Sequence, residues 1–493
     1  MVVQFDVVAG SVALRVGGLT QTVEFERLRP HIHQGFGAGI LSDFTSPFGK
    51  SPTPKNTGSR QPPVHNSALT ETRVRYNVPE EYNNRVHNEA DATGSRKWVS
   101  GMIKRIRIQS YKSLLDVDVT LQPLSVLFGP NAAGKSNFID ALQLLSRIAG
   151  SRSLKEAFEP PYRGKPMESF SFGECGLEGL MKRDSLSFVL EADVELSPAV
   201  ITAVNKEIQD TRKGQTTEGN GGGPKARKSS SYIHHTRLRY RIEIGIRPRS
   251  GVLQVVDEYL APLDKDWKPK TSPKAFLEKV HHNIHLRMEG QSHPTYFETR
   301  LDHAIVSRPH YPPHYPHLTA LSRELQSWYF YYFEPRERMR AATSVKEVRH
   351  IGLMGEELAA FLNTLKNRDP RQFADVEKAM HSLVPSVTGI RTDVNKFGEV
   401  ELSLDEGVIS MPARVVSEGT LRVLGLLSLI GVQEPPAVIG FEEPENGVHP
   451  RRIRDIAKLL VNRSLSGDTQ IIVTTHSPLL PDHVKSESLF VCR

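Results

Sequence analysis

The hydrophobic pattern of the chain changes abruptly near residue 102. Before it, the apolar stretches Val2–Val8 and Val12–Val16 predict a strand or two, and residues 42–100 form a polar tract rich in Pro, Ser, Asn, Thr and Gly. A tract with so little apolar periodicity cannot bury enough surface to offset its conformational entropy. We therefore expect residues 1–101 to be a mostly disordered or non-essential extension, which is either dispensable or the product of a misassigned start. From Met102 onward strand-like alternation begins, and we place the functional domain at 102–493.

The stretch LSVLFGPNAAGKSNFIDALQLL, at residues 124–145, organises the rest of the chain. Its apolar beginning predicts a buried strand, and its end predicts an amphipathic helix with one apolar face. Between them lies a GxxxxGK[ST] motif, and the order strand, glycine loop, helix is typical of a phosphate-binding P-loop. A glycine turn that merely joins a strand to a helix is the alternative, which this context disfavours.

The residue types of the loop predict a site for ATP and Mg²⁺. Gly129 and Gly134 allow backbone N–H groups to point inward, and the helix that opens at Lys135 adds its partial positive end. We expect Lys135 to reach the β- and γ-phosphates and Ser136 to hold Mg²⁺. The predicted cofactor-binding residues of the loop are Gly129, Pro130, Asn131, Ala132, Ala133, Gly134, Lys135, Ser136 and Asn137.

Downstream of the loop, the pattern predicts an insertion of strands and helices at about residues 200–350. Alternation predicts a strand at 187–196 and a hairpin formed by 238–246 and 252–260, with a flexible basic loop at 214–231. Six aromatic residues at 328–333 favour a buried strand over a surface that stacks on bases. A helix is expected at 356–366, followed by one that Asp369 caps and Pro370 begins.

Eight histidines lie within residues 281–317. A metal site there is conceivable, but the histidine spacings fit no standard ligand pattern. The prolines of 309–316 favour an extended surface loop instead.

The last eighty residues contain three further candidate elements. Ser417 can cap the apolar helix 421–430, and Gly419 lets backbone approach a phosphate, although an ordinary capped helix is the alternative. The buried strand AVIGF ends at Glu442 and Glu443. One carboxylate there can hold Mg²⁺, and the next can orient or deprotonate a water that attacks the γ-phosphate. A second apolar strand, 470–473, is followed by His476 and so places it at the same edge of the sheet.

Together, GPNAAGKSN, SEGT, AVIGFEEPEN and TTHSP resemble the ABC-type ATPase head shared by SMC-like, RecF-like and OLD-like proteins, in the branch labelled AAA-15/21 type. The resemblance covers about residues 102–493. It implies that Glu442 is the Walker B metal residue, that Glu443 is the catalytic base and that His476 is the switch histidine. The predicted catalytic residues are therefore Glu443, His476 and Lys135. The resemblance also implies that Ser417 to Gly419 complete a partner's ATP site and that Asn446 to His449 form the D-loop. Tyr111-Lys112-Ser113 is similar to the aromatic-Lys-Ser strand that precedes the P-loop in such heads.

The chain also departs from some relatives of this group. Lys135 and Ser417 are 417 − 135 = 282 residues apart, and SEGT stands where transporter subunits usually have LSGGQ, which argues against a transporter. No sustained heptads occur, so a long SMC-type coiled coil is not expected. OLD-type nucleases carry an acidic Toprim domain after the head, and this sequence ends 493 − 476 = 17 residues beyond His476. We therefore expect no Toprim nuclease domain.

Composition adds only broad limits. No run of about 18 apolar residues occurs, so no membrane partner is expected. Cys175 and Cys492 fit no CxxC pattern, which favours a reducing, cytoplasmic setting. The net charge of +7 permits nucleic acid as a partner, but a solvated basic surface is the commoner explanation.

These observations predict an α/β P-loop NTPase with an ABC-ATPase-like head, a mixed sheet and a large α+β insertion. We expect it to bind and hydrolyse ATP and to form a homodimer with ATP at the interface. We further expect it to act on DNA or a DNA-processing partner protein, in DNA repair or mobile-element defence. The alternative is a nucleotide-dependent regulatory switch for a partner effector, without nucleic-acid binding.

Overall fold

The computed structural model describes residues 3–8, 11–16, 19–24, 102–172, 176–215, 232–289, 293–430 and 436–492. The chain divides into two compact units, 1–86 and 87–493. The described part of the first unit is an antiparallel sheet of β1 (Val3–Val8), β2 (Ser11–Val16) and β3 (Leu19–Glu24). The first two strands were expected and β3 was not. The polar tract 42–100 lies outside the described residues, so its expected disorder stays a prediction.

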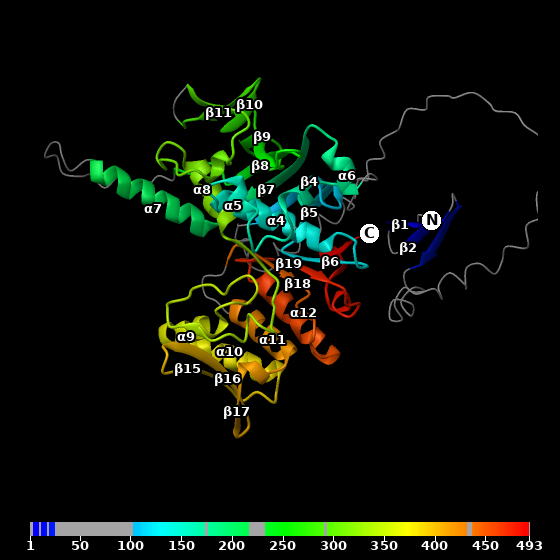
Figure 1. Ribbon diagram of the computed structural model, residues 1–493, viewed down its shortest axis with the longest axis vertical. Helices are drawn as coiled ribbons and strands as arrows, with labels where there is room; N and C mark the ends of the chain where they lie inside the picture. The colour runs from blue at the N-terminus through cyan, green and yellow to red at the C-terminus, as the bar shows by residue number, and fades with distance from the viewer. Residues whose placement is uncertain are drawn as a thin grey trace, which may run out of the picture. The chain divides into compact units, whose positions relative to one another are not determined.

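A five-stranded parallel sheet occupies the middle of the second unit (Figure 1). Its strands, in spatial order, are β13 (Trp328–Tyr331), β18 (Val438–Glu442), β19 (Gln470–Thr475), β6 (Leu124–Phe128) and β20 (Leu489–Val491). Glu442 lies opposite Thr474, and Thr475 lies opposite Phe128. The loops that follow β6, β18 and β19 therefore meet at one edge, the carboxyl edge, where open α/β sheets bind their ligands.

Both faces of this sheet are buried, in two separate apolar cores. Along β19, Ile472 belongs to the first core, whereas Ile471 and Val473 belong to the second. This alternation explains why these strands are continuously apolar in sequence. The first core contains α4 (Lys135–Gly150), which contacts both the parallel sheet and β4.

The first core is closed by an eight-stranded antiparallel sheet. In spatial order its strands are β12 (Pro294–Glu298), β11 (Asn283–Arg287), β10 (Leu277–Val280), β9 (Val252–Pro262), β8 (Arg237–Arg247), β7 (Leu186–Glu195), β4 (Met102–Tyr111) and β5 (Leu114–Thr120). The strand predicted at 187–196 is β7, and the predicted hairpin is β8–β9. The expected basic loop at 214–231 falls outside the described residues, apart from the end of a helix at 214–215.

Further helices contribute residues to the same apolar core as this sheet. They are α5 (Leu154–Ala157), α6 (Gly176–Met181), α7 (Pro198–Gln215), α8 (Pro316–Gln326) and the 3₁₀ turns η1 (Pro166–Ser169) and η3 (Ile305–Ser307). Helix α7 was not expected. It buries Val204 and Ile208, and Ser197 Oγ at its beginning donates to the buried Glu324 carboxylate at 2.8 Å.

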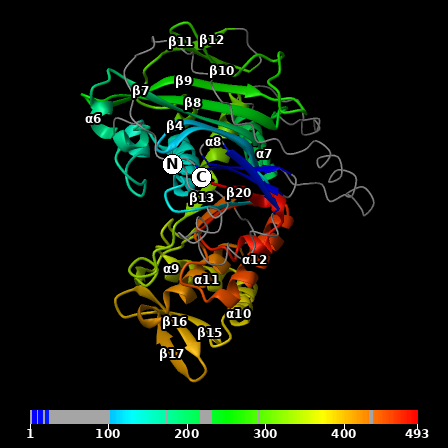
Figure 2. The same ribbon diagram turned by 90° about the vertical axis from the view of Figure 1, so that its right-hand side faces the viewer.

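The second core joins the other face of the parallel sheet to a helical layer. Its helices are α9 (Leu358–Arg368), α10 (Pro370–Leu383), α11 (Glu418–Ile430) and α12 (Pro450–Leu465). A small antiparallel sheet of β14 (Thr343–Ser344), β16 (Glu399–Glu406), β15 (Gly389–Val394) and β17 (Ile409–Pro412) lies at the opposite end of the second unit from β8–β12 (Figure 2). The remaining 3₁₀ turns are η4 (Ala413–Val415), η5 (Pro481–His483) and η6 (Ser486–Ser488).

The cap predicted before α10 is confirmed. Asp369 accepts the backbone N–H of Gln372 at 3.0 Å, and Pro370 is the first helical residue. The strand predicted at the aromatic run 328–333 is confirmed for its first four residues, which form β13, whereas Tyr332 lies beyond the strand and is 45% exposed. Among the described helices, none is long and apolar enough to cross a membrane.

The histidine-rich segment does not form one site. His281 and His282 are exposed at the β10–β11 turn, whereas His317 is buried in α8 with Nδ1 2.6 Å from Glu289 Oε2. Across the described ranges, no group of three or more His, Cys, Asp or Glu side chains is arranged to hold a metal. The expected extended loop at 309–316 is only partly correct, because its last residue, Pro316, begins α8.

Candidate functional site

The predicted P-loop connects β6 to α4 at the carboxyl edge of the parallel sheet. Its backbone has positive φ at Gly129 (151°), Ala132 (64°) and Gly134 (84°). A Cβ on Gly129 would lie 2.2 Å from the carbonyl oxygen of Cys492, and one on Gly134 would lie 2.9 Å from Ser113 Oγ. Glycine is thus required at both positions by close neighbours as well as by loop curvature. Among the described residues no side chain caps α4, so its first N–H groups remain available to an anion.

The ammonium group of Lys135 lies against the loop itself. Lys135 Nζ donates to the carbonyl oxygens of Gly129 (2.9 Å) and Pro130 (2.8 Å) and lies 3.2 Å from His476 Nδ1. Burial lowers the pKa of Lys135, against the opposing charge effects of Cys492 and Glu443. Pro130, Asn131 and Ala132 form the exposed tip of the loop.

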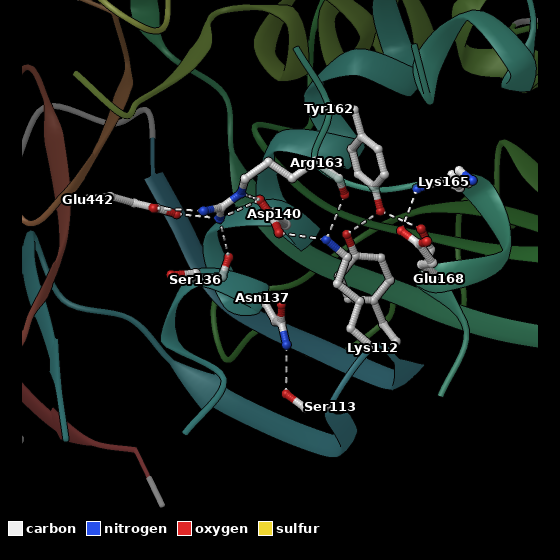
Figure 3. A network of polar contacts seen from close by, with 12 residues as sticks. Lys112, Ser113, Ser136, Asn137, Asp140, Tyr162, Arg163, Lys165, Glu168 and Glu442 are labelled. Carbon is white, nitrogen blue, oxygen red and sulfur yellow. Dashed lines mark hydrogen bonds and ion pairs between the residues drawn. The ribbon is translucent and has the colours of Figure 1, made fainter. Parts of the chain in front are cut away.

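An ion-pair network lies beside the first turns of α4 (Figure 3). The Arg163 guanidinium binds both carboxylate oxygens of Glu442, at 2.5 and 3.0 Å, and donates to Asp140 Oδ1 at 2.7 Å. It also donates to the carbonyl oxygen of Ser136 at 3.2 Å. Lys112 Nζ donates to Asp140 Oδ2 at 2.7 Å. Burial raises the pKa of Glu442 to about 7, although Arg163 opposes that shift.

Glu443 and His476 meet at the same edge. His476 Nε2 lies 2.6 Å from Glu443 Oε1, while the other ring nitrogen faces Lys135. Glu443 has φ of 46°, which is unusual for a residue with a side chain, and its N–H donates to Thr474 O at 2.9 Å. The structure thus brings together Lys135 at the beginning of α4 with Glu443 and His476, which follow β18 and β19, at the edge where the sequence predicted them. In this arrangement a carboxylate held by a histidine can accept a proton.

The residues present fit Mg²⁺ by their donor chemistry. Ser136 supplies a hydroxyl and Glu442 a carboxylate, the oxygen donors that a hard cation takes. One or two protein oxygen donors are typical for Mg²⁺, whose other ligands are usually waters and substrate phosphate oxygens. Asn137 donates from Nδ2 to Ser113 Oγ at 2.8 Å, toward the β4–β5 turn (Figure 3).

The predicted signature segment lies at the beginning of α11. Ser417 Oγ accepts the N–H of Thr420 at 3.2 Å, so the predicted cap is present. Gly419 is buried, and a Cβ there would lie 2.1 Å from the carbonyl oxygen of Gly447. The close approach that Gly419 permits is therefore to the chain's own D-loop segment. Within the described part of the chain, no hydrogen bond or ion pair joins residues 417–420 to the P-loop.

The D-loop segment is a tight turn. Asn446 N donates to Glu443 O at 3.0 Å, and His449 accepts the N–H of Arg451 at 3.3 Å as the cap of α12. Glu445 is buried and accepts a hydrogen bond from Thr475 Oγ1, and burial raises its pKa. This turn directly follows the end of β18 and contacts α11 through Gly447.

Sequence reasoning missed Asp140, Arg163 and the close approach of Cys492. Asp140 is 2% exposed and lies among the apolar residues of α4. Because a buried carboxylate is costly unless it is paired, this position indicated that a cationic side chain binds it. Nothing local to Tyr162-Arg163-Gly164 identified that cation. Tyr111-Lys112-Ser113 supports the same network, since Tyr111 Oη lies 2.8 Å from Tyr162 Oη.

A short segment of the chain is similar in sequence to a known nuclease. The OLD nuclease of Thermus scotoductus (strain ATCC 700910 / SA-01) is 39% identical over 44 residues, which are 9% of this chain and 8% of that protein. The chain therefore matches only a small part of that relative.

Solved structures gave weak similarity. The SMC head bound to the C-winged helix domain of ScpA has 13% identity and a TM-score of 0.42, covering 78% of this chain and 91% of that one. The SMC head domain from Thermotoga maritima has 14% identity and a TM-score of 0.34, covering 79% and 94%.

One protein family matches most of the chain. Its pattern, described as "AAA domain, putative AbiEii toxin, Type IV TA system", matches residues 124–211 and 229–482. These ranges contain 88 + 254 = 342 of the 493 residues and include Lys135, Ser417, Glu443 and His476. The chain belongs to this family of AAA-type ATPases.

Proposed function

We propose that the protein binds ATP with Mg²⁺ at the P-loop and hydrolyses it to ADP and phosphate. The observation that carries the proposal is the convergence of Lys135, Glu443 and His476 at one sheet edge, beside the uncapped beginning of α4. Lys135 holds the β- and γ-phosphates, and Ser136 and Glu442 hold Mg²⁺. The metal ion neutralises phosphate charge when it is bound.

Each polar residue then has a distinct task. Glu443 accepts a proton from the attacking water, and His476 orients the carboxylate that does so. The N–H groups at the beginning of α4 receive phosphate oxygens. Arg163 must release Glu442 before that carboxylate can join a metal ion, because it now binds both oxygens.

We further propose that two copies associate around ATP, with Ser417 and Gly419 of one copy completing the site of the other. This proposal is supported by the exposure of Ser417 and by its lack of a bond to its own P-loop within the described residues. The N-terminus of α11 would then contribute a second partial positive charge to the phosphates.

The Glu443→Gln protein tests both the hydrolysis and the dimer. An ATPase assay measures its turnover, and sedimentation with ATP and Mg²⁺ measures its association. The amide can still hydrogen-bond but cannot take a proton, so turnover should fall on the order of 100-fold or more while ATP remains bound. Since hydrolysis no longer releases the pair, a dimer should accumulate. Wild-type turnover would contradict the assigned base. A monomer at saturating ATP would contradict the shared site.

For the biological target we propose DNA or a DNA-processing protein, in DNA repair or mobile-element defence, within the cytoplasm. The net charge of +7 and the similarity to an OLD nuclease support this. Salt-dependent DNA binding that stimulates ATP turnover would distinguish this role from a switch that regulates a protein effector without nucleic acid.

A further inference from the structure

The chain leaves β13 at the carboxyl edge and makes a rigid turn before it enters the helical layer. The Glu334 carboxylate accepts the N–H groups of Arg336, Glu337 and Arg338, at 3.1, 2.9 and 3.0 Å. Met339 then packs against α11, where a Cβ on Gly425 would lie 2.8 Å from Met339 Cε. The turn is thus fixed in place against the helix that begins with the signature.

Two arginines from this turn flank the signature segment. Arg340 Nη2 donates to the carbonyl oxygen of Val416 at 2.6 Å. Arg336 Nε lies 2.8 Å from Glu418 Oε1, and its side chain is 75% exposed. Arg336 is therefore held beside Ser417, on the solvent-facing side of the beginning of α11.

The ion pair between Arg336 and Glu418 contributes little to folding. Exposed pairs of this kind add little stability, because water screens them and holding two long side chains in one geometry costs entropy. The same weakness makes Arg336 easy to transfer to a stronger acceptor. A phosphate offers a guanidinium two parallel hydrogen bonds and more negative charge than one carboxylate.

The cations of the chain's own P-loop edge are engaged differently. Arg163 is bound to Glu442 and Asp140, and Lys112 is bound to Asp140. An exposed guanidinium beside Ser417 would supply the further positive charge that a transferring phosphoryl group requires.

We propose that Arg336 contacts the phosphates of the ATP bound to the P-loop of a second copy of this chain. The proposal rests on the shared site described under the proposed function. In the ATP-bound pair Arg336 exchanges Glu418 for the partner's nucleotide and acts in trans, beside the N-terminus of α11. Glu418 holds the guanidinium at this position until the pair forms.

The first test measures association of the Glu443→Gln protein with ATP and Mg²⁺. Adding Arg336→Ala should weaken the dimer on the order of 100- to 10,000-fold, because each of the two symmetric sites loses one charged hydrogen bond worth about 10- to 100-fold, and should leave ATP binding to the monomer unchanged. Arg349→Ala serves as the matched control, since Arg349 is also exposed and paired, with Glu347 at 3.1 Å. Equal dimerisation with and without Arg336→Ala would overturn the inference alone. If Glu443→Gln itself stays monomeric, the shared site and this inference both fail.

The second test asks whether Arg336 acts in trans. Arg336→Ala and Lys135→Ala proteins, each deficient in turnover, are mixed in equal amounts. One site in each mixed pair combines an intact P-loop with an intact Arg336, so about a quarter of wild-type turnover should return. If the mixture turns over ATP no faster than the two proteins assayed separately and added together, Arg336 acts within its own chain, which overturns the proposal.

Discussion

The P-loop edge and the signature end of α11 use charge in opposite ways. At the P-loop edge the carboxylates of Asp140 and Glu442 are 2% and 6% exposed and share one guanidinium. At the signature end, Arg336 and Glu418 form a single pair with side chains 75% and 39% exposed. Buried charges must be satisfied within the chain, whereas an exposed pair can exchange partners at little cost. The buried charges of the P-loop edge are thus paired within the chain, whereas Arg336 at the signature end can exchange its partner, as our proposal requires.

The largest expected effect comes from Lys135→Ala at the P-loop edge. Removing the ammonium group takes away the charge assigned to the β- and γ-phosphates, so turnover should fall on the order of 100-fold or more. The fold should survive, because Lys135 bonds only to loop carbonyls and His476. Steady-state ATPase assays with circular dichroism check this. Undiminished turnover in a folded protein would refute the P-loop assignment.

Arg163→Ala tests the buried side of the comparison. It leaves Glu442 and Asp140 without their shared guanidinium, so the free energy of unfolding should fall by about 2–4 kcal/mol, a value reduced because Arg163 is partly exposed. Arg336→Ala, which breaks the exposed pair, should leave the free energy of unfolding almost unchanged, because water replaces the lost contact. Denaturant unfolding of both proteins measures the contrast. Equal losses would remove the distinction between the two regions.

Gly419→Ala tests how tightly α11 packs on the D-loop segment. The added methyl group would meet the Gly447 carbonyl at 2.1 Å, so we expect a loss of about 1–3 kcal/mol from a backbone shift. Gly150→Ala is the control, since its methyl group would meet only Gln326, at 3.5 Å. Thermal unfolding separates them. An unchanged melting temperature for Gly419→Ala would contradict this prediction, because the turn at Gly447 would then move away from the added methyl group without loss of stability.

The smallest effect is expected for Ser417→Ala at the signature end. Loss of the helix cap should cost about 0.5–1 kcal/mol, since Ser417 is exposed and water can replace the lost acceptor. If Ser417 also acts across a dimer, the Glu443→Gln background should reveal weaker ATP-driven association. Stability loss without any change in association would make Ser417 a cap only.

Local pattern was enough to predict the elements that carry the chemistry. The strand before Gly129 and the acids after AVIGF stand out because a continuous apolar run followed by polar residues marks the end of a buried strand. The Asp369-Pro370 helix start was equally clear, because capping depends on residues three positions apart. Parallel strands then bring their ends to one edge, which is why Glu443 and His476 could be expected near the P-loop.

Only the tertiary structure decided which distant groups meet. Arg163 and Glu442 are 279 positions apart, and Arg336 and Glu418 are 82 apart. Cys492 reaches Gly129 through the pairing of β20 with β6, and Gly447 reaches Gly419 through the packing of α11. Periodicity records whether a residue is buried, but not which strand or turn lies opposite it. That choice depends on strand order and helix packing, so the partners of Asp140, Glu442 and Gly419 came from the fold alone.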